Sequence, residues 1–88
     1  MDWDETKRRS NLAKHGLDFR DFERFDWDRI VDFPSDVIDG EERLRVAGPM
    51  IDRLVFATYV ERAGTMRLIS LRPLTRHEYR EWIEQHGG

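Results

Sequence analysis

Four side chains near the N-terminus have types and a spacing that suit the handling of a phosphate ester. If residues 5–15 form a helix, Lys7, Asn11, Lys14 and His15 fall within an arc of about 100° on its surface. The two ammonium groups could hold a phosphate, and the imidazole could act as an acid or a base near neutral pH. An ordinary solvated polar face would have the same pattern, so the spacing alone leaves both interpretations open.

A second group of candidates consists of arginines in the second half of the chain. Three of them punctuate a predicted hairpin and two lie in the strand before it: Arg62, Arg67 and Arg72, then Arg43 and Arg45. A guanidinium group binds phosphate through two parallel hydrogen bonds and can stabilise charge that builds on phosphorus. Alternatively, these are surface arginines paired with the many acidic side chains.

Several other catalytic chemistries lack their residues. The chain has no cysteine, which excludes thiol catalysis and cysteine-ligated zinc. Its three histidines form no metal-binding spacing, and its aspartates do not fit a calcium loop. No serine stands in a G-x-S-x-G context. We therefore expect neither a metal nor a cofactor.

Helical signals dominate the first part of the chain. Asp4 is the predicted N-cap of a helix over residues 5–15, and Gly16 is its predicted stop. Three phenylalanines recur every three residues and predict a second helix over residues 18–25, with a buried aromatic stripe. A short edge strand at Trp3, a strand over residues 29–33 and an acidic loop over residues 34–42 complete this half.

The second half alternates in the manner of strands. Predicted strands cover residues 43–46, 53–61 and 66–72, and the last two form a hairpin around Ala63-Gly64. A two-residue turn would pair Val60 with Arg67, Thr58 with Ile69 and Phe56 with Leu71. These residues would face the helices, and the opposite face would carry a site together with Tyr59, Leu68, Ala57, Ser70, Val55 and Arg72.

Thr75 and Glu78 form a capping box at the start of a final helix. The predicted fold class is therefore α+β. Two N-terminal helices and a C-terminal helix would pack on a three- to four-stranded antiparallel sheet, in one domain over residues 1–88.

The charge of the chain is uneven. Residues 1–42 hold 13 acidic and 7 basic side chains, whereas residues 43–88 hold 5 acidic and 8 basic ones, which gives the net charge of −3. An acidic total argues against a nonspecific nucleic-acid binder. No apolar run approaches the roughly 20 residues that cross a bilayer, and the N-terminus lacks the apolar core of a signal peptide. We expect a cytoplasmic protein with no membrane contact.

Short motifs occur along nearly the whole chain in a characteristic order. They are W-D-x-x-K from Trp3, N-x-x-K-H-G from Asn11, G-E-E-R from Gly40, Y-x-x-R from Tyr59 and R-x-I-S-x-R from Arg67. This order resembles the BrnT family, the toxin half of the bacterial BrnT–BrnA type II toxin–antitoxin systems. The family usually has alanine where this chain has Leu71, and Pro73 is a second departure that could move Arg72.

The resemblance implies a RelE-like fold and metal-independent cleavage of RNA that inhibits growth. It implies catalytic roles for Lys14, His15, Arg62, Arg72 and Glu78, and contacts to RNA from Lys7, Asn11, Arg43, Tyr59 and Arg67. His15 would transfer one proton, with Glu78 and Tyr59 as candidates for the other transfer. It also implies a BrnA-like antitoxin that neutralises the toxin in a hetero-oligomer and alone contacts operator DNA. The alternative is a catalytically weak or inactive module that binds an antitoxin and takes part in repression.

Overall fold

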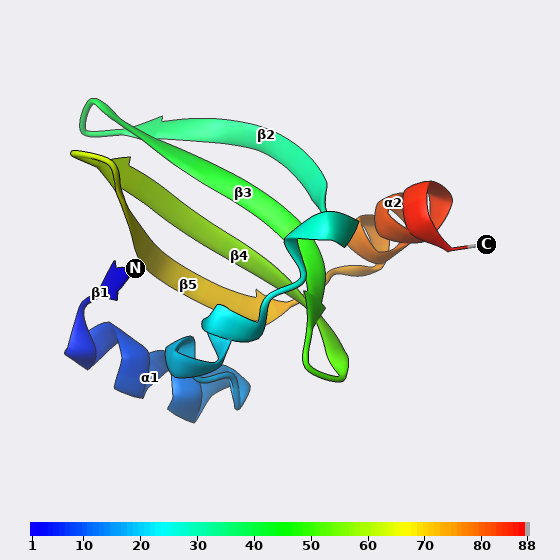
Figure 1. Ribbon diagram of the computed structural model, residues 1–88, viewed down its shortest axis with the longest axis horizontal. Coiled ribbons are helices and arrows are strands. Elements are labelled where there is room, and N and C mark those ends of the chain that lie inside the picture. Colours follow the sequence, from blue (N-terminus) through cyan, green and yellow to red (C-terminus); the bar gives the residue numbers. More distant parts are fainter. Residues whose placement is uncertain (88) are drawn as a thin grey trace.

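A computed structural model describes residues 1–87, which form a five-stranded sheet with helical segments on both faces (Figure 1). The strands lie in the order β1-β5-β4-β3-β2. Along the chain the elements are β1 (Asp2–Trp3), α1 (Glu5–His15), the 3-10 helices η1 (Phe19–Arg24) and η2 (Trp27–Arg29), β2 (Val31–Ile38), β3 (Glu41–Met50), β4 (Arg53–Arg62), β5 (Thr65–Pro73) and α2 (Arg76–His86). Within this part of the chain, no helix is long and apolar enough to cross a membrane.

The N-terminal part contains one α-helix rather than the predicted two. Asp4 caps α1 by accepting from the backbone N–H groups of Thr6 and Lys7, and Gly16 ends it with φ at 69°. The predicted second helix is instead the 3-10 segment η1. The phenylalanines recur every three residues, which matches the 3.0 residues per turn of a 3-10 helix better than the 3.6 of an α-helix.

The sheet has five strands rather than three or four, because β1 and β2 both join the three strands of the second half. Residues 34–42 are also not a loop. They form the end of β2, the start of β3 and the tight turn that connects the two strands. Asp39 and Gly40 make this turn with φ values of 52° and 77°. Positive φ at both central residues is typical of the Asp-Gly turn of a β-hairpin.

The sheet is mixed, whereas an antiparallel sheet was predicted. The expected strand at Trp3 is confirmed as β1, and it pairs with β5 in the parallel direction. The other neighbouring strands are antiparallel. Because β1 has only two residues, it covers only part of the outer edge of β5, and α1 lies along that strand too.

A β-bulge in β5 changes the predicted faces of the hairpin. Val60 pairs with Arg67 as predicted, but Ile69 is an extra residue, so Thr58 pairs with Ser70 instead of Ile69. Beyond the bulge Phe56 pairs with Arg72 instead of Leu71. The extra residue returns alternate side chains to the opposite face, and this places Ser70 and Arg72 on the face of Thr58.

The main core lies on the face that was predicted to be mixed. Leu17 and the phenylalanines of residues 19–25 pack there against buried strand residues, namely Val46, Val55, Ala57, Leu68 and Leu71. On the other face Trp82 of α2 covers Val31, Ala47 and Phe56 at one end of the sheet. The capping box of Thr75 and Glu78 that begins α2 is confirmed.

Candidate active site at the edge of strand β5

Asn11 attaches α1 to the edge of β5. Its side chain is only 8% exposed, and it is the one buried residue of α1. The amide Nδ2 donates to the Leu17 carbonyl at 3.0 Å, and Oδ1 accepts from the Leu71 backbone N–H at 3.2 Å. The amide therefore pairs a backbone donor of the strand and fixes the position of the helix that carries the other candidates.

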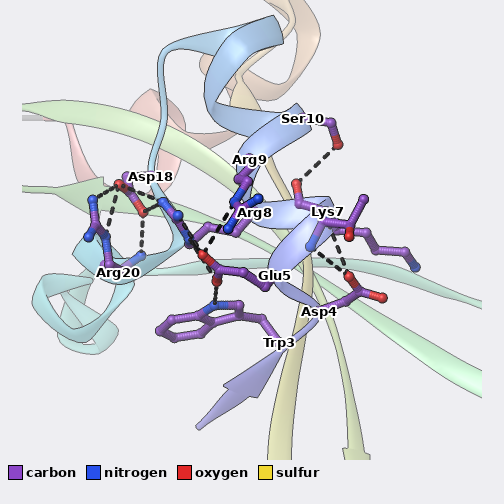
Figure 2. A network of polar contacts seen from close by, with 10 residues as sticks. Trp3, Asp4, Glu5, Lys7, Arg8, Arg9, Ser10, Asp18 and Arg20 are labelled. Carbon is purple, nitrogen blue, oxygen red and sulfur yellow. Dashed lines mark hydrogen bonds and ion pairs between the residues drawn. The ribbon is translucent and has the colours of Figure 1, made fainter.

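Charged side chains fasten the start of the same helix (Figure 2). The Trp3 indole and the Arg8 guanidinium both donate to Glu5, at 3.1 and 2.8 Å. Arg8 also reaches Asp18 at 3.3 Å, and Arg20 donates to Asp18 at 2.8 Å. The bond from Arg8 lowers the pKa of Glu5 to about 2, and the bond from Arg20 lowers that of Asp18 to about 2. This network fastens a helix whose one buried side chain is the polar Asn11.

The polar residues predicted from helical spacing surround one cavity of about 220 Å³. Lys7, Asn11, Lys14 and His15 line it from α1, together with Ser10, while Ile69 and Ser70 line it from β5. No carboxylate lines the cavity, and the only carboxamide in its lining is that of Asn11. The cavity therefore combines two ammonium groups and an imidazole, a set that suits an anion.

Arg72 is held rigidly beside this edge. Its guanidinium stacks on the Phe56 ring at 4.0 Å and forms two bonds with the Glu78 carboxylate, at 2.8 and 2.9 Å. Because Ser70 and Arg72 project from the same face two residues apart, Arg72 lies close to the strand position that lines the cavity.

Glu78 is occupied by these contacts. It binds Arg72 and also accepts from the Thr75 backbone N–H at 2.8 Å. Burial acts to raise the pKa of Glu78, but the bonds from Arg72 and Thr75 outweigh burial and lower it. The pKa of Arg72 is raised in turn, chiefly by its bond to Glu78. Glu78 thus remains an ionised partner of Arg72, which makes it a poor proton donor.

The remaining predicted arginines lie farther along the sheet. Arg62 is at the end of β4 beside the turn, where it binds Glu41 at 2.6 Å. In Figure 1 the β2–β3 and β4–β5 turns lie side by side, at the end of the sheet away from α2. Arg72 pairs with Phe56 of β4. Phe56 and Arg62 are six positions apart on that strand, which corresponds to roughly 20 Å. Arg62 and Arg72 therefore do not converge on one phosphate.

Arg67 and Arg43 are on the same face as Arg72, by strand register. Arg67 pairs with Asp2 of the neighbouring strand β1, whereas no ion pair of Arg43 occurs within residues 1–87. Tyr59 is on the opposite face, where its ring meets Trp27 with centroids 5.8 Å apart. Burial raises the pKa of Tyr59. The sheet thus separates Tyr59 from the arginines.

Two residues at this edge were missed by the sequence reasoning. Ser70 was predicted on the face that would carry a site, but it was not named as a site residue; the bulge at Ile69 places it opposite Thr58, on the other face. Arg53 looked like the first residue of a strand, yet it shares a second cavity with His15. Over residues 1–87, no group of three or more His, Cys, Asp or Glu side chains is arranged to hold a metal ion.

A family model matches most of the chain. The model of a family described as "Ribonuclease toxin, BrnT, of type II toxin-antitoxin system" matches residues 3–78, which extend from β1 to Glu78. A search of curated proteins gave no significant match. Because the match covers most of the 88 residues, the chain belongs to the BrnT family of ribonuclease toxins of type II toxin–antitoxin systems.

Proposed function

We propose that this chain cleaves RNA at the α1–β5 edge and slows bacterial growth until a BrnA-like antitoxin binds it. The observation that carries this proposal is the cavity in which Lys7, Lys14 and His15 meet Ser70, with Arg72 two residues farther along β5. The membership of the ribonuclease toxin family supports the same activity. In this proposal the protein acts in the cytoplasm, and operator DNA is contacted only through the antitoxin.

The proposed reaction uses the RNA as its own nucleophile. A base takes the proton of a ribose 2′-OH, whose oxygen then forms a bond to the adjacent phosphorus. The bond from phosphorus to the 5′ oxygen breaks, and an acid protonates that oxygen. The products are a 2′,3′-cyclic phosphate and a 5′-hydroxyl end. Cations near the phosphate stabilise the charge that builds on it during attack.

The geometry favours particular roles for the residues at this edge. His15 carries the one imidazole of the cavity and transfers a proton, while Lys14 and Arg72 stabilise charge on the phosphate. Glu78 orients Arg72 through its paired hydrogen bonds. Lys7 binds the RNA backbone beside Lys14, and Asn11 positions the helix.

The arginines of the open sheet face bind RNA away from the reacting phosphate in this proposal. Arg43, Arg62 and Arg67 share that face by register. Tyr59 lies on the opposite face against Trp27 and therefore contributes to packing rather than to proton transfer.

A mutational test compares matched histidines in an RNA cleavage assay. We expect His15→Ala and Arg72→Ala to lower the rate by about 10²-fold or more, the usual cost of losing an acid–base group or a charge stabiliser. His77→Ala is the control, because His77 is exposed on α2 and lines none of the cavities at the β5 edge. Expression of the wild type should slow growth, and expression of His15→Ala should not.

Thermal melts separate catalytic effects from loss of the fold. Phe22→Ala should act through stability, at roughly 3–5 kcal/mol, because Phe22 is fully buried. A His15→Ala protein that melts much earlier but keeps full specific activity would give His15 a structural role. A wild-type chain that binds its antitoxin but cleaves no RNA would favour the noncatalytic alternative.

A further inference from the structure

His15 lines a second cavity, of about 250 Å³, that extends the edge site toward the start of β4. Arg53 lines it together with the apolar side chains of Leu17, Leu54 and Pro73. Arg53 is exposed, and no carboxylate within residues 1–87 forms an ion pair with it. His15 thus stands between the cavity of the two lysines and a cavity that contains a free guanidinium.

Most arginines of the sheet face differ from the cations at the edge, although Arg43 on that face has no ion pair within residues 1–87. Four arginines of the face are each bound to a carboxylate of the chain, in the pairs Arg45–Asp36, Arg62–Glu41, Arg67–Asp2 and Arg72–Glu78. Lys7, Lys14 and Arg53 have no such partner in the part of the chain that the structure describes, and no carboxylate lines either edge cavity. An anion at the edge therefore gains its contacts without first displacing an internal carboxylate.

We infer that Arg53 is an RNA-binding residue and that the RNA backbone runs along the edge from Lys7, past His15, to Arg53. This inference rests on the proposed function only in taking RNA as the ligand. If the reacting phosphate lies between Lys14 and His15, Arg53 holds a neighbouring phosphate across the second cavity. The planar guanidinium suits this role, because it can donate two parallel hydrogen bonds to a phosphate. The apolar side chains of Leu54 and Pro73 offer a surface for a ribose or a base.

The test measures binding without cleavage. The probe is a fluorescein-labelled 2′-O-methyl oligoribonucleotide, which keeps every phosphate but has no free 2′-OH to attack. We expect Arg53→Gln to weaken binding about tenfold, a typical loss for one charge-assisted contact. The slope of log affinity against log salt should also become shallower by about 0.7, the value for one phosphate contact on a single strand. Affinity is measured by fluorescence anisotropy at several salt concentrations.

Arg24→Gln is the matched control, because Arg24 is exposed on η1, has no ion pair among the described residues and lines neither edge cavity. Both variants change the net charge equally, so a general charge effect would move both. Equal affinities and salt slopes for wild type and Arg53→Gln would overturn the inference even if the protein cleaves RNA. Binding that depends on Arg53, in a protein that does not cleave RNA, would support the inference and count against the proposed function.

Discussion

The amide of Asn11 joins helix, loop and strand through two hydrogen bonds, to the Leu17 carbonyl and the Leu71 N–H. The next turn of the same helix carries Lys14 and His15, so the amide sets the distance between these side chains and β5. Asn11, which the sequence suggested as an RNA contact, thereby positions the helix that carries the site residues. Its effect on cleavage passes through the position of α1.

Replacement of Asn11 by alanine should destabilise the protein and weaken cleavage together. Each of the two backbone groups left unpaired costs about 1–3 kcal/mol when it stays buried. Asn11→Asp should keep the bond from Leu71 but lose the bond to Leu17, and so fall between alanine and wild type in its hydrogen bonding while burying a charge. Urea unfolding measures both variants.

Ser10→Ala is the control for this series, because Ser10 is exposed on the same helix and bonds only to the Lys7 carbonyl. It should change the free energy of unfolding by less than about 0.5 kcal/mol. Stability unchanged in Asn11→Ala would contradict the role given to the amide.

Helical spacing was sufficient to place Lys7, Lys14 and His15 around one cavity. It could not show that Asn11 is buried and structural rather than exposed to a ligand, because both kinds of amide occur at the same helical spacing. The difference comes from the unpaired N–H of Leu71, which exists only once β5 has its place in the sheet. The sequence also could not place Arg53 beside His15, because 38 positions separate the two residues along the chain and only the folded sheet brings them to one cavity.

At the scale of elements, α1 depends on charge to stay in place. The bonds from Arg8 and Arg20 hold the pKa values of Glu5 and Asp18 near 2, below their ordinary values of 4.5 and 3.8. Carboxylates with lowered pKa values stabilise the folded state at pH values above their ordinary pKa. This contribution is lost as the pH falls from about 4.5 toward 2.

The docking of α1 should therefore weaken in acid, and Asp18→Asn should reduce that dependence. The variant keeps a cap for η1 but loses the charge that pairs with Arg8 and Arg20. At pH 7 we expect a loss of about 1 kcal/mol, the upper end for a partly exposed pair, or roughly 4–8 °C in Tm. At pH 2.5 the melting temperatures of the variant and the wild type should approach each other.

Glu84→Gln provides the comparison, because Glu84 is exposed on α2 and has no ion pair within residues 1–87. It should follow the wild type at both pH values. A constant difference between Asp18→Asn and wild type from pH 7 to pH 2.5 would mean that the charge of Asp18 does not hold the helix.

Elements with a strong local signal were predictable, and the packing of the sheet was not. The Ala63-Gly64 turn and the capping box of Thr75 fixed the hairpin end and the start of α2. The bulge at Ile69 depends on how β5 meets both β4 and the helix, so alternation alone assigned the faces wrongly. The Asp39-Gly40 turn did have a hairpin signal, which the acidic residues around it obscured.

Across the whole molecule, three arginines of the open sheet face, Arg45, Arg62 and Arg67, are already bound to carboxylates. These internal carboxylates occupy the positions that an acidic partner or a phosphate would take. An acidic segment of an antitoxin would exchange with them one pair at a time. If RNA uses the same arginines, the antitoxin and RNA compete for one surface, and the complex is catalytically silent.

Alanine variants of Arg43, Arg62, Arg67 and Arg72 should show this competition. We expect antitoxin affinity and cleavage rate to fall together, each by about tenfold at the most affected positions. Arg24→Ala, remote from the edge cavities, should change neither quantity. If no variant affects both, inhibition acts from a distance, for example through displacement of α1 with Lys14 and His15.

Cleavage by attack of a ribose 2′-OH leaves characteristic products, and one substrate is enough to identify them. The substrate is a DNA oligonucleotide with a single ribonucleotide, incubated with the isolated chain in EDTA and analysed by mass spectrometry. We expect one cut, directly 3′ of the ribonucleotide, with a 2′,3′-cyclic phosphate and a 5′-hydroxyl end, and a rate about 10²-fold lower for His15→Ala. A cut between deoxynucleotides, a 5′-phosphate product, or activity that EDTA abolishes and a divalent ion restores would contradict this mechanism.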